Sequence, residues 1–207
     1  FSALAFGTDA DGDILDAPFN RDRLRGFRVK ADGDMADAWL GVNQFNVTVS
    51  QGIEGAGSSA NGNLLASRIV GRVDFTKVEG TVSRLQPLGA GFSFLAALYG
   101  QYAFDPLLAP EQCGYGGRFF GRAYDPSQIL GDQCVFAIGE LRYDIPGLPA
   151  YLTSAQLYAY ADWGTLHTRA AAVGTDPNVE AASLGAGVRF ALDKYFNVDL
   201  SAAKAVE

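Results

Sequence analysis

The chain has 207 residues, 48% of them hydrophobic, which is enough to bury a sizeable core in one domain or part of one. Its 16 Lys and Arg residues against 23 Asp and Glu residues give a net charge of -7, which argues against a nucleic-acid partner. The longest strongly apolar run, residues 92–99, is too short for a spanning helix, which needs about 20 residues.

The pattern along the chain predicts strands. It begins at Phe1 without an initiator methionine or a signal-peptide pattern, so we expect an excised segment of a longer protein. Turn residues recur regularly, and the segments between them alternate with a period of two, which predicts an all-β fold. Antiparallel strands, about nine in all, are predicted at residues 1–6, 23–31, 38–50, 65–85, 91–104, 133–145, 154–165, 182–192 and 195–205.

Four aspartates follow the first predicted strand and suggest a calcium loop. However, Gly12 falls at the wrong position for an EF-hand, and no glutamate follows at the required distance. We therefore expect a solvated outer loop at Asp9, Asp11, Asp13 and Asp16.

A glycine-rich loop follows the predicted strand at 91–104. Cys113 and Cys134 flank it, and a disulfide between them would close a loop of about 20 residues and contribute roughly 3 kcal/mol in the chain-entropy model. The alternative is two unrelated small residues at strand ends. No histidine or second cysteine pair accompanies them, so no metal site is predicted. Residues 114–117 do not form a phosphate cradle, because neither a Lys-Ser/Thr pair nor a helix follows.

Strand length and charged faces favour a transmembrane β-barrel over a soluble sandwich. Strands of about ten residues suit a tilted membrane strand. Charges recur on one face of the later strands, at Glu140, Arg142 and Asp162, as a wet lumen requires. Bacterial single-chain barrels have an even number of strands and no open edge, so about nine strands predict a chain that is incomplete at one or both ends.

The loop and its surroundings carry a set of short motifs. Outside the loop, the motifs lie at residues 49–52, 83–88, 100–102, 140–143 and 160–164. Inside it, the motif consists of Gly116, Gly117, Gly121, Arg122, Tyr124, Asp125, Gly131 and Asp132. Together they resemble the lid-loop region and barrel strands of two-partner secretion translocators, the ShlB/FhaC/HecB family of the BamA-type superfamily.

This resemblance implies a sixteen-stranded barrel in the bacterial outer membrane, preceded by periplasmic POTRA domains. Residues 1–207 would be the C-terminal portion of that barrel, with the POTRA domains and final strand outside the chain. The implied function is export of an unfolded haemolysin- or adhesin-like exoprotein. The implied partners are the exoprotein, outer-membrane lipids and the barrel assembly machinery. No cofactor is implied.

The resemblance also implies that Arg122 pairs with Asp162 and locks the loop inside the barrel. The residues support this pairing, because Asp162 is in phase with the lumen-facing positions of its strand and a guanidinium can bind a carboxylate through two hydrogen bonds. A solvated surface pair, contributing about 0–1 kcal/mol, is the alternative. Glu140 and Arg142 either support the loop from the lumen or pair across strands.

The chain departs from the family pattern at two places. Ala123 stands where the family often has glycine, so it would be strained if that position requires a positive φ. The chain stops at residues 205–207 instead of an aromatic-ended strand.

Catalysis is not expected, because His167 is the single histidine and no Gly-x-Ser-x-Gly elbow is present. The alternative functions are a BamA- or TamA-like barrel insertase and a stand-alone ligand-binding barrel.

Overall fold

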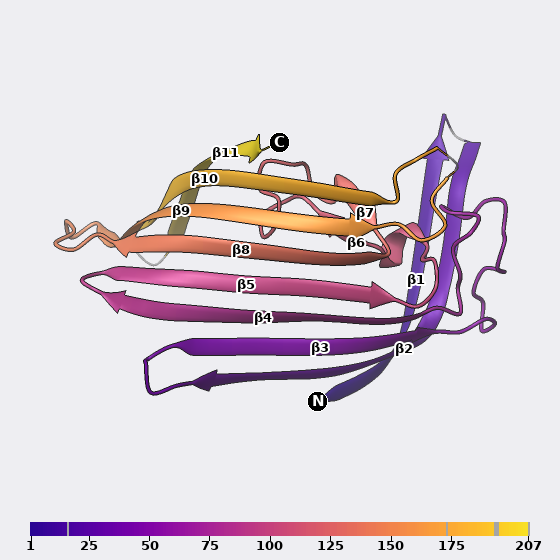
Figure 1. Ribbon diagram of the computed structural model, residues 1–207, viewed down its shortest axis with the longest axis horizontal. Helices are drawn as coiled ribbons and strands as arrows, with labels where there is room; N and C mark the ends of the chain where they lie inside the picture. The colour runs from indigo at the N-terminus through magenta and orange to yellow at the C-terminus, as the bar shows by residue number, and fades with distance from the viewer. Residues whose placement is uncertain (16, 173, 193–194, 207) are drawn as a thin grey trace.

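The computed structural model describes residues 1–15, 17–172, 174–192 and 195–206. Nine strands form one antiparallel sheet in the order β1-β2-β3-β4-β5-β8-β9-β10-β11, and β6 and β7 form a separate pair (Figure 1). The predicted all-β antiparallel class is therefore confirmed. The elements are β1 (Ser2–Ile14), β2 (Ala17–Ala36), β3 (Val42–Gly52), β4 (Thr76–Gly89), β5 (Phe92–Ala103), the 3-10 helix η1 (Ala109–Glu111), β6 (Cys113–Tyr115), β7 (Ile129–Gly131), β8 (Gln133–Asp144), β9 (Leu152–His167), β10 (Asn178–Leu192) and β11 (Phe196–Val206).

The two ends of the sheet differ in the length of their connections. At one end, which we call the turn end, β2, β4 and β8 are joined to the next strand by short turns such as residues 37–41. At the other, the loop end, β3, β5 and β9 lead into long connections at residues 53–75, 104–132 and 168–177. The loop end lies on the right in Figure 1. It therefore holds both the glycine-rich loop and the segments that surround it.

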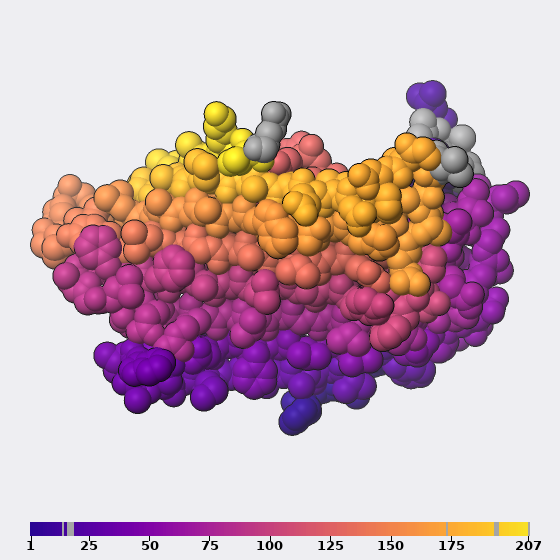
Figure 2. All heavy atoms as spheres, in the orientation of Figure 1, coloured from indigo at the N-terminus to yellow at the C-terminus, as the bar shows by residue number. Residues whose placement is uncertain are grey.

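The two faces of the sheet differ as the alternation predicted. On β8 and β9 the apolar side chains of Val135, Leu141 and Leu157 are exposed. The opposite phase carries Glu140, which is 0% exposed, and Asp162, which is 4% exposed. Side chains fill the gaps between the ribbons, so the sheet is a continuous wall in Figure 2.

The predicted strand at residues 65–85 begins only at Thr76. The apolar residues before Thr76 look like a strand in the sequence, but they are apolar because they are buried under the loops. Val73 and Phe75 are 1% and 0% exposed because they pack with Leu24 and Leu107 in a hydrophobic cluster at the loop end. They form a core beneath the loops instead of one face of a strand.

The β1–β2 hairpin is longer than predicted and includes most of the acidic stretch. Asp11 pairs with Arg23 and Asp9 with Arg25, each at 2.6 Å across the two strands. Opposite charges on facing strands stabilise a pairing that aspartate alone disfavours. The outer-loop prediction is therefore wrong for Asp9, Asp11 and Asp13, which lie on β1, and Asp16 lies outside the described residues.

Helix contributes little to this fold. Among the described residues, no helix is long and apolar enough to cross a membrane.

Candidate functional site

The connection between β5 and β8, residues 104–132, folds back against the polar face of the sheet; we call it the lid loop. Within it, β6 and β7 pair with each other; β6 contacts β8 of the sheet and β7 contacts β9. Tyr115, at the end of β6, is 0% exposed and lies 5.3 Å from the ring of Phe136 on β8. Gly164 on β9 makes room for it, since a Cβ there would lie 2.5 Å from the Tyr115 ring. Aromatic packing thus fixes the loop inside the curve of the sheet.

Glycines shape the tip of the lid loop, which we define as residues 116–125. Gly116, Gly117 and Gly121 have φ values of 122°, 109° and 73°, a region that favours glycine. A Cβ on Gly121 would also lie 2.7 Å from the Gly116 nitrogen. Ala123 is not among the residues with positive φ. Its Cβ therefore introduces no backbone strain, and the departure from the family pattern is tolerated here.

The guanidinium of Arg122 binds Glu140. Arg122 Nη1 lies 2.7 Å from Glu140 Oε2, and the guanidinium carbon lies 4.2 Å from the centre of the Tyr160 ring. Glu140 also accepts hydrogen bonds from Arg142 Nε at 2.7 Å and Arg189 Nη1 at 2.8 Å. One buried carboxylate thus neutralises part of a cluster of three arginines, of which only Arg122 comes from the lid loop.

Asp162 holds the tip through different groups. Its Oδ1 accepts hydrogen bonds from the Tyr115 hydroxyl at 2.5 Å, the Gly121 amide at 3.0 Å and the Ser183 hydroxyl at 2.8 Å. The Arg122 contact is made by its backbone amide, at 3.5 Å from Oδ2. The expected Arg122–Asp162 guanidinium pair is therefore replaced by two anchors. Glu140 binds the charge and Asp162 binds the backbone.

The geometric reason lies in the register of β8 and β9. Glu140 faces Tyr160, and Asp162 faces Ile138, so the two carboxylates lie two positions apart on adjacent strands. The turn at Gly121 directs its amide to Asp162 and places the Arg122 side chain beyond it, over Tyr160. Both acidic residues were predicted to face the lumen, but the loop conformation decides which of them the guanidinium reaches.

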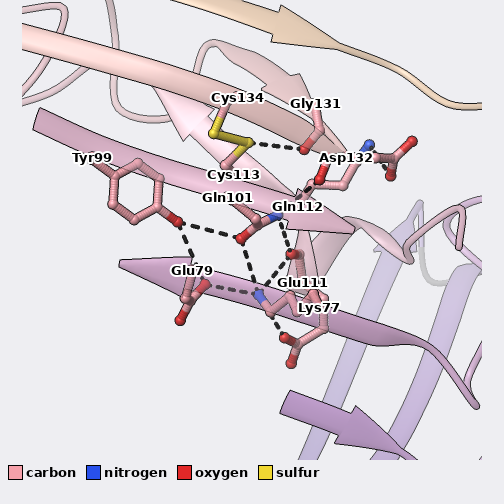
Figure 3. Close-up of a disulfide and its surroundings, with 10 residues drawn as sticks. All are labelled: Lys77, Glu79, Tyr99, Gln101, Glu111, Gln112, Cys113, Gly131, Asp132 and Cys134. Carbon is pink, nitrogen blue, oxygen red and sulfur yellow. Dashed lines mark hydrogen bonds and ion pairs between the residues drawn. A yellow bond between two sulfur atoms is a disulfide. The ribbon is translucent and has the colours of Figure 1, made fainter. Parts of the chain in front are cut away.

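Cys113 and Cys134 are joined by a disulfide, which links β6 to β8 (Figure 3). Gly131 lies beside it, with its carbonyl oxygen 3.2 Å from Cys113 Sγ. Asp132, which follows, is 0% exposed and binds Arg68 Nη1 at 2.6 Å. These four predicted residues, Cys113, Gly131, Asp132 and Cys134, therefore lie at the base of the lid loop, away from its tip.

The other predicted residues have smaller roles. The Tyr124 hydroxyl donates to the Ala182 carbonyl at 3.4 Å, and Asp125 is exposed near the tip. His167 lies at the end of β9 with its Nδ1 at 2.9 Å from Asn178 Oδ1.

Several important residues were missed by the sequence reasoning. Lys77 and Glu111 are buried and ion-paired at 3.0 Å. Lys77 is in phase with Glu79 on β4, which could have shown that it faces inward. Glu111 ends the short 3-10 helix η1 and Arg68 lies in the connection at residues 53–75, so no strand periodicity indicates their direction.

A cavity of about 800 Å³ separates the lid loop from the other half of the sheet. Its lining combines charged, amide and aromatic side chains. They include Arg28, Lys77, Glu79, Gln101, Phe120 and Arg122. The polar face thus presents side chains that can contact polar chain segments, and the lid loop fills only part of the space beside this face.

A sheet with an exposed apolar face, a polar inner face and a loop folded onto that face has the design of a transmembrane β-barrel wall. The profile of the family "Haemolysin secretion/activation protein ShlB/FhaC/HecB" matches residues 35–190. The chain belongs to this family, which consists of transporters and not of enzymes.

Two similar proteins are both named CdiB. The chain is 28% identical over 129 residues to the outer membrane transporter CdiB of Dickeya dadantii (strain 3937), covering 62% of this chain and 23% of the relative. The solved structure of CdiB from Escherichia coli matches with a TM-score of 0.76 at 20% identity, covering 91% of this chain and 34% of that one. The chain thus spans about a quarter to about a third of the length of these proteins (23% and 34%), and the second match shows a shared fold.

Proposed function

We propose that the chain forms part of the wall of an outer-membrane pore that exports an unfolded haemolysin- or adhesin-like exoprotein. Membership of a haemolysin secretion family and homology to an outer-membrane transporter support this proposal. In it, residues 1–207 are a C-terminal portion of the barrel, while POTRA domains and a closing strand belong to other parts of the protein. Secretion is favoured over barrel insertion because the matched family is described by secretion and activation.

The faces of the sheet set the proposed orientation. The exposed apolar side chains contact outer-membrane lipid, and the long connections of the loop end are extracellular, as in other outer-membrane barrels. The short turns then face the periplasm, where the barrel assembly machinery receives the chain. The exoprotein passes along the polar face, beside the lid loop, and no nucleotide is required.

The anchored tip of the lid loop carries the proposal. Arg122 and the Gly121 amide bind two buried carboxylates of the wall, Glu140 and Asp162. Loss of one partner leaves a buried donor or charge unpaired. An unpaired donor costs about 1–3 kcal/mol, and an unpaired charge costs more. Such a contact keeps the loop inside the lumen at rest and can be exchanged for contacts with an unfolded chain.

Charge exchange in the full-length protein tests the function. We expect Arg122→Glu and Glu140→Arg each to reduce the exoprotein in the culture medium several-fold with the barrel still in the membrane. The double exchange restores an ion pair with the same total charge and should recover part of the secretion. Arg118→Glu is the matched control, because Arg118 lies exposed in the same loop and should secrete normally.

A second exchange separates the two anchors. Arg122→Asp combined with Asp162→Arg should not recover secretion. Asp162 accepts hydrogen bonds from the Gly121 amide and the Tyr115 hydroxyl, and an arginine side chain has no acceptor to replace it. Normal secretion by both Arg122→Glu and Glu140→Arg would contradict the anchored-lid mechanism. Loss of many other outer-membrane proteins in these cells, with no change in exoprotein export, would instead support an insertase.

A further inference from the structure

The base of the lid loop is held by groups that the secretion mechanism above does not use. We define the root as Glu111 and Cys113 on one side of the loop and Asp132 and Cys134 on the other. The two sides meet where Cys113 pairs with Gly131 in the β6–β7 ladder. The disulfide then joins the root to β8, a strand of the wall.

Asp132 connects the root to all three long connections of the loop end. Its carboxylate is 0% exposed and accepts from Arg68 Nη1 at 2.6 Å, the Leu107 amide at 2.9 Å and the Arg169 amide at 2.7 Å. Arg68 comes from residues 53–75 and Arg169 from residues 168–177. A buried carboxylate with this many donors is a structural junction, and moving it would leave several groups unpaired at once.

Glu111 fixes the other side of the root to the opposite half of the sheet. It is 2% exposed and binds Arg28 of β2 at 2.6 Å and Lys77 of β4 at 3.0 Å. Lys77 also donates to the Glu111 carbonyl at 3.0 Å and to Gln101 of β5 at 3.2 Å. Figure 3 shows Lys77, Gln101 and Glu111 converging near the disulfide. The root therefore spans from β2 to β8.

The tip is held less extensively than the root. Its contacts with the buried carboxylates are the ion pair from Arg122 to Glu140 and the hydrogen bonds from the Gly121 and Arg122 amides to Asp162. Phe119 beside them is 82% exposed. An incoming chain can replace the tip contacts one at a time. Displacing the root would break a covalent bond and separate two buried carboxylates from their cations together.

We propose that the root is a fixed pivot and that the lid loop opens as a closed ring, releasing only its tip. Arg28, Lys77 and Arg68 are then positioning residues that hold the root while the tip moves. This inference rests on the proposed secretion function. The ring from Cys113 to Cys134 has a sequence separation of 21. With β6 and β7 still paired, half of residues 116–128 can extend by up to roughly 20 Å, so the tip can leave Glu140 with every root contact intact.

Distances between pairs of spin labels can test the pivot in the oxidised full-length protein, reconstituted in lipid nanodiscs without exoprotein. The two cysteines of residues 1–207 are paired, so within this part of the protein labels attach to the introduced ones. One pair reports on the tip, with Phe119→Cys and Ala159→Cys. The other reports on the root, with Leu130→Cys and the same reference on the exposed face of β9. Each pair is measured in the native background and with Arg122→Ala.

The proposal makes a specific prediction for both pairs. With Arg122→Ala, the tip distance should shift or broaden by at least about 10 Å, the span of three extended residues, while the root distance changes by less than about 3 Å. Asp132→Asn, or Lys77→Gln if that variant does not fold, should move the root pair as well. An equal shift of both pairs under Arg122→Ala overturns the pivot. So does a tip that stays in place when Asp162→Ala is added to Arg122→Ala, because the double variant removes both anchors of the tip. Because no exoprotein is present, a failed secretion assay leaves this result unaffected.

Discussion

Glu140 is the residue on which the positive charges of the polar face converge. Arg122, Arg142 and Arg189 all contact its carboxylate, and Arg189 also binds Asp199 at 3.1 Å. Each guanidinium carries five N–H donors, more than Glu140 and Asp199 accept, so the cluster can bind a further acceptor. Carbonyl oxygens of an unfolded chain are such acceptors. The arginine cluster therefore holds the lid at rest and offers alternative contacts when cargo arrives.

Asp162 acts mainly as a hydrogen-bond acceptor, and this yields the first prediction. Asp162→Asn keeps an Oδ1 that can accept from the Tyr115 hydroxyl and the Gly121 amide, so it should lower the free energy of unfolding by about 1 kcal/mol. Asp162→Ala leaves these donors unpaired and should cost about 3 kcal/mol or more. Urea unfolding followed by the gel mobility of the unheated barrel measures both values.

A simple ion-pair role for Asp162 predicts a different order. If its charge held the Arg122 guanidinium, the Asn and Ala variants would be destabilised to a similar degree. Equal losses would therefore contradict the backbone-anchor description.

At the scale of elements, small residues on one strand make room for aromatic residues on the next. Gly185 of β10 faces Tyr160 of β9, and a Cβ on Gly185 would lie 2.6 Å from the tyrosine oxygen. Tyr160 in turn lies beneath the Arg122 guanidinium. The position of the lid tip thus depends on a glycine two strands away from Glu140, because that glycine lets the tyrosine ring lie flat against the sheet.

The turn at residues 37–41 gives a prediction about pH. The Arg84 guanidinium hydrogen-bonds to Asp37 and lowers the pKa of its carboxyl from 3.8 to about 2, with help from the Gly41 and Trp39 amides. Because the folded-state pKa is lowered, this contact contributes its full stability above about pH 4 and loses it as the pH falls through about 2. The thermal midpoint of the barrel should therefore fall over this range.

Two variants check the cause of this pH dependence. Asp37→Asn removes the titrating group, and Arg84→Gln removes its partner, so both should reduce the fall in thermal midpoint between pH 4 and pH 2. Heating series on samples in detergent at several pH values measure the effect. An unchanged slope in both variants would show that other carboxylates control acid stability.

At the scale of the whole molecule, alternation predicted the fold because lipid and lumen impose opposite polarity on successive residues of each strand. It predicted that Glu140 and Asp162 face inward, and both do. It could not choose between them as the partner of Arg122, since two carboxylates two register positions apart look equivalent from periodicity. That choice depends on the turn at Gly121, whose geometry is not encoded in strand phase.

The strand boundaries that were predicted wrongly, in the β1–β2 hairpin and at residues 65–75, also depend on contacts that strand phase does not show. The acidic residues of the β1–β2 hairpin have low strand propensity individually, and their arginine partners lie 12 or more positions away. Residues 65–75 show the reverse case, because apolar side chains that cover a core beneath the loops look like a strand face. Local patterns fail wherever contacts between distant residues determine the conformation.

The last prediction concerns the pore as a unit. In planar lipid bilayers, the full-length protein with Arg122→Ala should show a higher mean conductance than the native protein, because release of the tip opens the space that the lid loop occupies. The cavity of about 800 Å³ beside the loop already provides part of a path; Arg118 and Arg122 both lie on its lining, but it is Arg122 that binds Glu140. Arg118→Ala removes the same charge from an exposed position of the same loop and should leave the conductance unchanged. If the two variants conduct alike, the current reflects loop charge alone, and the Arg122–Glu140 contact does not close the pore. If only Arg122→Ala conducts more while the disulfide stays oxidised, closure depends on the tip, as a lid attached at its root requires.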